Sequence, residues 1–214
     1  MIQKITFATL AFLCCSFFVN AQIKEGSILV GGQVYYANTI LKTSNGQTTQ
    51  KQNNGVIDLS LGKAIKDNAV IGIHLEFAPG STSNNGSIIY KTKSTGYGAG
   101  VFYRQYKTLA KDFYFFIEAD VNYFYGKVTT VDTAGNKYQI TTGSTVQLSL
   151  APGISYKVLK NLHLEVTIPQ IISAQYTVNK ASGQSQLTSQ NLAFSTNLNS
   201  TTLNNLSVGF RLIF

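Results

Sequence analysis

The chain has 214 residues and a net charge of +8, yet only 12% of its residues are charged. That is half of the ~25% typical of soluble domains. Its 12 tyrosines and 13 phenylalanines exclude the charge-rich, aromatic-poor composition of a disordered protein. The length fits one domain, and the composition predicts a folded protein with little charged surface.

Residues 1–21 have the three parts of a secretory signal peptide. Lys4 gives a positive start, an apolar run extends from Ile5 to Phe18, and Val19-Asn20-Ala21 forms a small-residue cleavage site. The apolar run is short for a transmembrane helix, which needs ~20 residues. We therefore expect a mature domain at 22–214.

Both cysteines, Cys14 and Cys15, lie within this leader, and neither follows the small residue that lipidation normally requires. The mature chain is thus expected to have no disulfide and no thiol chemistry. A basic chain can bind nucleic acid or an anionic membrane, and export favours the membrane.

Eight segments of the mature chain alternate apolar and polar residues with the period of two typical of β-strands. They are residues 27–37, 55–63, 69–77, 95–106, 112–125, 145–157, 162–172 and 204–214.

The connections between these segments alternate between long and short. The long ones are polar and are expected to be loops: 38–54, 78–94, 126–144 and 173–203. Short turns are expected near 63–68, 107–111 and 158–161. An even number of strands with its short turns at one end predicts an all-β, eight-stranded antiparallel up-and-down transmembrane β-barrel. Both termini then lie on the side of the short turns.

The last segment, 204–214, indicates how the barrel closes. Leu206, Val208, Phe210, Leu212 and Phe214 fall on one face, and the other face carries small residues and Arg211. An unpaired strand edge in hydrocarbon costs several kcal/mol per backbone group, so the last strand must pair with the first.

Seven ionisable residues in the strand middles share the face opposite the apolar one. They are Asp58, Glu76, Arg104, Glu118, Asp120, Glu165 and Arg211. That face is otherwise rich in Gly, Ala and Ser, which is typical of a narrow, packed lumen. Because an unpaired buried charge is costly, we expect both arginines to form networks with Glu118, Asp120 and Glu165. The excess of carboxylates predicts that any leak through the lumen prefers cations.

Aromatic residues of the apolar face gather near the strand ends, as in the interfacial girdles of membrane barrels. Those toward the long loops are Tyr36, Phe77, Tyr97, Tyr123 and Tyr125, and those toward the turns are Tyr103, Phe113, Tyr156 and Phe214. The alternative is the scattered core aromatics of a soluble sandwich. Such a sandwich, however, would have no reason to sort its loops by length.

Few residues suggest chemistry. His74 and His163 lie on the lumen face of different strands, and we expect both to be packed or hydrogen-bonded there rather than catalytic. The glycines of the G-Y-G-A-G run at 96–100 share one strand face and precede no helix, so they do not predict a phosphate-binding loop. No cofactor, metal site or enzymatic activity is expected.

Lysines cluster at both ends of the predicted barrel. Those at the long-loop end, Lys42, Lys51, Lys91, Lys93 and Lys127, are expected either near lipid phosphates or as ordinary solvated side chains. The same alternatives hold for the lysines at the turns, Lys63, Lys66, Lys107, Lys111, Lys157 and Lys160.

In its signal peptide, strand pattern and terminal Phe214, the mature chain resembles the eight-stranded outer-membrane β-barrels of the OmpX and OmpA transmembrane-domain type. The resemblance implies loops outside the cell, termini in the periplasm, and insertion by the barrel-assembly machinery. That machinery would recognise the closing strand through Phe210, Leu212 and Phe214. We expect a departure from OmpA, namely that no periplasmic peptidoglycan-binding domain follows the barrel.

The expected role is that of a monomeric structural or surface-interaction barrel with a plugged polar lumen, in contact with outer-membrane lipid and not with nucleic acid. A narrow, cation-preferring, porin-like channel is the alternative, and a lipid-modifying enzyme comes third. Resemblance to a widely used fold predicts no surface ligand.

Overall fold

The computed structural model describes residues 23–42, 48–85, 89–131, 137–168, 170–182, 187–196 and 206–214. The first described residue is Ile23. The predicted signal peptide at 1–21 therefore lies outside the described part of the chain. Ten strands are present in these ranges. They are β1 (Ile28–Lys42), β2 (Thr48–Lys66), β3 (Ala69–Asn85), β4 (Ile89–Ala110), β5 (Phe113–Val131), β6 (Lys137–Lys157), β7 (Leu162–Thr167), β8 (Ile172–Ser182), β9 (Leu187–Thr196) and β10 (Ser207–Ile213).

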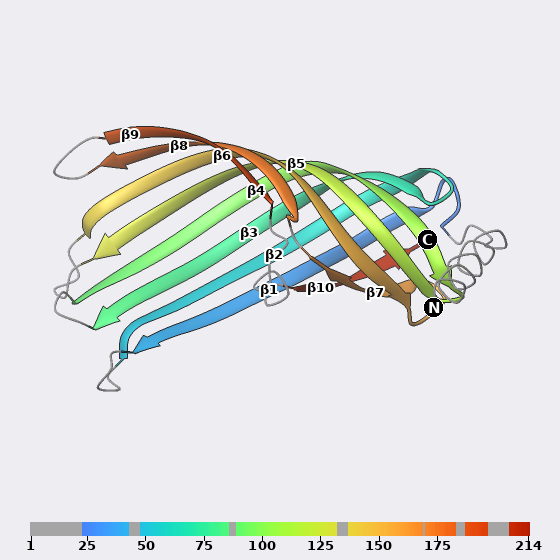
Figure 1. The fold of residues 1–214 in the computed structure, drawn as a ribbon, viewed down its shortest axis with the longest axis horizontal. Coiled ribbons are helices and arrows are strands. Elements are labelled where there is room, and N and C mark those ends of the chain that lie inside the picture. The colour runs from blue at the N-terminus through green and yellow to red at the C-terminus, as the bar shows by residue number, and fades with distance from the viewer. Residues whose placement is uncertain are drawn as a thin grey trace, which may run out of the picture.

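Eight of these strands form a closed antiparallel ring, in the order β1 to β7, then β10 and back to β1. The closing pair runs from Leu29 opposite Ile213 to Val34 opposite Val208. Ile28 and Phe214 exchange two further backbone hydrogen bonds, of 3.0 and 2.9 Å. The predicted fold class is thus confirmed, and the chain ends beside its first strand (Figure 1).

The outer wall of this ring is apolar on every strand. Large hydrophobic side chains are exposed on all eight: Val34, Leu59, Leu75, Val101, Val121, Leu148, Leu164 and Val208. A soluble monomer rarely exposes a continuous apolar surface of this extent. The aromatic residues predicted for the two girdles also face outward, and Phe77 packs on Tyr97 with ring centroids 5.4 Å apart. The wall is that of a barrel embedded in lipid.

The four segments predicted as long loops are mostly strand, and that part of the prediction is wrong. β1 runs on to Lys42, β4 begins at Ile89, β8 begins at Ile172 and covers 173–182, and β9 lies within 173–203. Most of these extensions are rich in Thr, Ser, Asn and Gln on both faces, so they lack the apolar alternation that marks a strand in sequence. β8 is the exception, because it alternates Ile172, Ala174, Tyr176 and Val178 with Ser173, Gln175, Thr177 and Asn179, a signal that the sequence prediction missed. Their backbones pair with the neighbouring strand all the same, as in the register from Ala37 opposite Asn54 to Leu41 opposite Gln50.

The predicted strand 162–172 is interrupted, because β7 ends at Thr167 and β8 begins at Ile172. Both continue along β6: Gly153 registers with Thr167 and Leu150 with Ile172, so two extra residues are accommodated between them. Gln170, in this interruption, has a left-handed backbone with φ of 52°. An insertion of two residues keeps the parity of the strand, and Ser173 therefore faces the lumen as Thr167 does.

Candidate functional site

An apolar layer is packed in the lumen at the turn end. Eight buried side chains form it: Ile23, Leu29, Ala64, Val70, Phe102, Tyr106, Tyr114 and Phe116. Ile23 precedes the first strand, and its carbonyl accepts a hydrogen bond of 2.9 Å from the amide of Asn68 in the β2–β3 turn. The segment before β1 thus helps to fill this end of the barrel, a contribution that strand periodicity could not reveal.

Above this layer lies a group of four charged residues that we call the arginine layer: Arg104, Glu118, Glu165 and Arg211. Nε of Arg104 donates to Oε2 of Glu118 at 2.8 Å, and its Nη1 donates to Oε2 of Glu165 at 2.7 Å. The register pairs Arg104 with Glu118 directly across β4 and β5, which places the first contact. The guanidinium of Arg104 also lies 4.1 Å from the centroid of the Phe116 ring.

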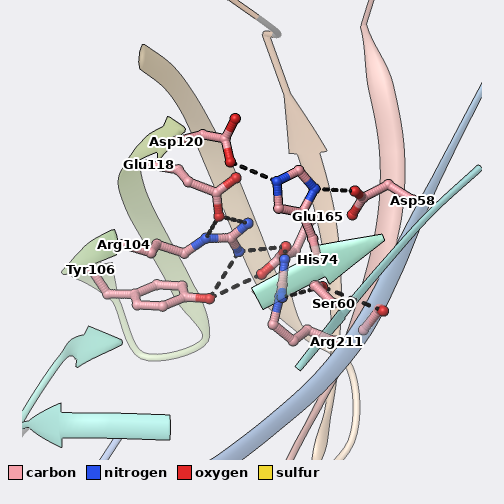
Figure 2. A network of polar contacts seen from close by, with 10 residues as sticks. Asp58, Ser60, His74, Arg104, Tyr106, Glu118, Asp120, Glu165 and Arg211 are labelled. Atoms are coloured by element: carbon pink, nitrogen blue, oxygen red, sulfur yellow. Dashed lines mark hydrogen bonds and ion pairs between the residues drawn. The ribbon is translucent and has the colours of Figure 1, made fainter. Parts of the chain in front are cut away.

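Glu165 is the centre of the arginine layer (Figure 2). Besides Arg104, it accepts a hydrogen bond of 3.2 Å from Nε of Arg211 and another of 3.2 Å from the hydroxyl of Tyr106. Arg211 in turn donates to Oγ of Ser60 at 2.8 Å. Arg104, Glu165 and Arg211 have exposed fractions of 0%, 1% and 2%. The two arginines and two glutamates balance in charge, as burial requires.

A second group, the acidic layer, lies further from the turns and consists of Asp58, His74, Glu76, Asp120 and Asn122. His74 lies between two aspartates, with Nδ1 2.6 Å from Asp58 and Nε2 2.7 Å from Asp120 (Figure 2). A neutral imidazole can donate from one nitrogen only, so this arrangement needs an imidazolium ring or a protonated aspartate. Asp120, which we expected beside the arginines, pairs with His74 instead.

The remaining acid of this layer, Glu76, accepts a hydrogen bond of 3.1 Å from the side-chain amide of Asn122. Three carboxylates thus face one histidine, and the acidic layer keeps an excess of negative charge even when His74 is protonated. Gly100 makes room for this arrangement, because a Cβ at that position would collide with Nε2 of His74. The three glycines of the G-Y-G-A-G run therefore leave this part of the lumen face without side chains.

His163 has a different environment. Its Nδ1 lies 3.0 Å from Oγ of Ser155, and its ring packs on Tyr114 with centroids 5.4 Å apart. Ser155 is fully buried and His163 is 3% exposed. Both side chains are therefore packed inside the lumen, as expected for His163.

No metal centre stands out among the residues described: no three or more His, Cys, Asp or Glu side chains are grouped to hold an ion. Nor does any helix in the described ranges have the length and apolarity needed to cross a membrane. Of the residues predicted as the assembly signal, Phe210 and Leu212 lie on β10 and Phe214 directly follows it. Phe210 faces outward with 48% exposure and registers with Gly32.

Comparison with models of protein families gives no match, and a search of curated proteins finds none. Among solved structures, the chain is similar to a major outer membrane protein of Thermus thermophilus, with a TM-score of 0.51 and 11% identity over 88% of this chain and 98% of that one. It is also similar to neisserial surface protein A (TM-score 0.43, 16% identity, 89% and 98% covered). The outer membrane protease OmpT of Escherichia coli gives a TM-score of 0.44 and 7% identity, with 93% and 100% covered.

At these identities the likeness concerns the fold alone. The likeness of the fold to the Thermus structure, together with the strand pairing and apolar wall of this chain, shows a β-barrel of the outer-membrane type.

Proposed function

We propose that the protein is an integral, monomeric barrel of the bacterial outer membrane, of the OmpX and OmpA transmembrane-domain type, with a closed lumen and a structural or surface-interaction role. The observation that carries the closed lumen is the arginine layer, whose Arg104, Glu165 and Arg211 are almost completely buried. Eight strands enclose an interior just wide enough for side chains to fill. The apolar layer beneath the arginine layer closes the same interior a second time.

The strand extensions support the surface role. β4 has 22 residues and β6 has 21, whereas crossing a bilayer takes ~9–11. The additional residues form a polar sheet beyond the aromatic girdle at the end of the barrel opposite the short turns. Neutral side chains form hydrogen bonds across its strands, as between Thr92 and Thr130 at 3.2 Å. In this proposal the sheet lies outside the cell, the termini lie in the periplasm, and the barrel-assembly machinery recognises the closing strand.

A narrow, cation-preferring channel is the second candidate, favoured by the excess of carboxylates in the acidic layer. It would require the arginine layer to open. A lipid-modifying enzyme comes third, because no outward-facing His, Asp or Glu lies on the described strands at the level of the apolar wall.

Planar-bilayer recording of the refolded mature protein tests the closed lumen. We expect no sustained conductance, and gel mobility that changes on heating only when the protein has folded in detergent or lipid. Stable, large, weakly selective native channels would favour the porin alternative. A folded, monodisperse monomer in plain buffer would contradict the membrane assignment itself.

The orientation is tested by single-cysteine labelling in intact cells, since residues 22–214 contain no cysteine. Lys91→Cys, on the strand extensions, should react with a membrane-impermeant maleimide. Lys160→Cys, in the β6–β7 turn, should react only after the outer membrane is opened. The reverse pattern would invert the proposed orientation.

A further inference from the structure

Six lysines stand on the outer surface of the strand extensions, and we call them the lysine belt. They are Lys42, Lys51, Lys91, Lys93, Lys127 and Lys180, and each is exposed. On their strands they share the parity of the apolar wall, as Lys93 does with Tyr97 and Lys127 with Tyr125. The belt therefore continues the lipid-facing surface rather than lining the lumen.

Strand register gathers these lysines into rows. Lys127 registers with Thr142, which registers with Lys180, so the two amines stand two strands apart. Lys51 and Lys91 are related in the same way through Ser83. Two strands span ~10 Å, and lysines at successive outward positions, such as Lys91 and Lys93, are ~7 Å apart. Long, flexible side chains at these spacings can converge on one multiply charged headgroup.

The belt has only one sign of charge. Over the side chains that the structure describes in the strand extensions, no Asp or Glu faces outward. The turn end differs, because its lysines are mixed with Glu25, Asp67 and Asp112. Solvated surfaces usually intersperse both signs, whereas a patch of one sign attracts an oppositely charged partner.

The height of the belt indicates which partner. Lys127 is the first outward residue beyond Tyr125, and Lys93 is the second beyond Tyr97. Outward residues follow one another every ~7 Å along a strand tilted by ~45°, so these amines lie roughly 5–10 Å beyond the aromatic girdle. Aromatic girdles mark the level of the headgroups, so the long side chains of Lys93 and Lys127 can reach lipid phosphates, and Lys91 lies one outward position further out than Lys93.

We propose that the lysine belt binds lipids whose headgroups carry phosphate monoesters, in the leaflet next to the strand extensions. A phosphate monoester carries a charge of about −1.5 to −2 near pH 7 and three acceptor oxygens, so it can form ion pairs and hydrogen bonds with several amines at once. A phosphodiester carries one negative charge and therefore attracts the lysine amines less strongly. This proposal rests on the membrane location proposed above.

The test uses the refolded mature protein in phosphatidylcholine nanodiscs with a minor share of phosphatidic acid, a monoester lipid, and native mass spectrometry counts the lipids that stay bound. We expect phosphatidic acid to be enriched over phosphatidylcholine and over an equal share of phosphatidylglycerol, a diester. Replacing Lys91, Lys93, Lys127 and Lys180 by Gln should lower the enrichment at least tenfold, because each lysine at a charged surface contributes about fivefold.

The matched control replaces four turn-end lysines by Gln, namely Lys63, Lys107, Lys157 and Lys160. It removes the same charge and should keep most of the enrichment. Equal loss in the control, or equal enrichment of phosphatidylglycerol, would overturn the proposal in favour of general attraction by net charge. Displacement of phosphatidic acid by inorganic phosphate at a comparable concentration would show that the belt is a site for free anions, and it would overturn the proposal too.

Two failures remain distinguishable. A protein that folds in pure phosphatidylcholine nanodiscs but shows no preference for the monoester contradicts the lysine-belt proposal alone. A protein that does not fold in detergent or in any of the lipids contradicts the proposed membrane function.

Discussion

Glu165→Gln tests whether the arginine layer is held by charge or merely by shape. The substitution keeps the size of the side chain, but it leaves Arg104 and Arg211, both almost fully buried, with Glu118 as the remaining carboxylate of the layer. Breaking a buried ion pair by removing one partner costs ~3–5 kcal/mol, and we expect this loss in the free energy of unfolding. Glu118→Gln should cost less, ~1–3 kcal/mol, because the Glu118 side chain is 18% exposed and contacts Arg104 alone among the arginines.

The assay is urea unfolding of the refolded protein in lipid vesicles, followed by far-ultraviolet circular dichroism because the chain contains no tryptophan. Adding Arg211→Met to Glu165→Gln restores the charge balance of the layer. The double variant should therefore lose at least ~1 kcal/mol less free energy of unfolding than the sum of the losses of the two single variants, because neighbouring residues in one network are energetically coupled. A Glu165→Gln protein within ~0.5 kcal/mol of the wild type, or strictly additive losses, would refute the electrostatic reasoning.

Three further predictions concern the wall and the acidic layer. Phe210→Asp places a charge in lipid and should reduce membrane yield, at a cost below the ~2–4 kcal/mol of a lipid-facing Arg or Lys, whereas Ser207→Asp on the lumen face should be milder; equal yields would show that the faces are misassigned. Gly100→Ala should lower the unfolding free energy by ~1–3 kcal/mol because its Cβ meets His74, while Gly126→Ala, whose Cβ would lie 3.4 Å from the Phe124 ring, should be tolerated. His74→Ala leaves two aspartates facing each other, so bilayer recordings should show any residual leak become more cation-selective; unchanged selectivity would count against this account of the acidic layer.

The class of fold could be predicted from the sequence because the bilayer imposes strict rules on it. Within lipid, one face of every strand must be apolar, and the last strand must pair with the first. The alternation around Leu59 or Phe210 and the apolar face of the closing strand are direct consequences. Beyond the lipid the constraint disappears, and the polar extensions of β1, β2 and β4 could not be distinguished from loops by sequence. Only backbone pairing with a neighbouring strand reveals them.

For the lumen, too, part of the arrangement could be predicted from the sequence and part could not. Parity alone assigned the seven ionisable residues to one face, and the adjacency of β4 and β5 placed Arg104 beside Glu118. The position of His74 between Asp58 and Asp120 depends on the stagger of the strands around the ring, which relates residues that are distant in sequence and that no periodicity connects. Ile23 and Asn122 likewise carry no signal of their own.

The sequence by itself therefore determined the face of each residue, because side chains alternate with a period of two whatever the register. The tertiary structure alone decided which lumen residues meet. Contacts across a closed barrel depend on strand stagger, on irregularities such as the interruption between β7 and β8 near Gln170, and on the room that Gly100 leaves. These are properties of the whole ring rather than of any one strand.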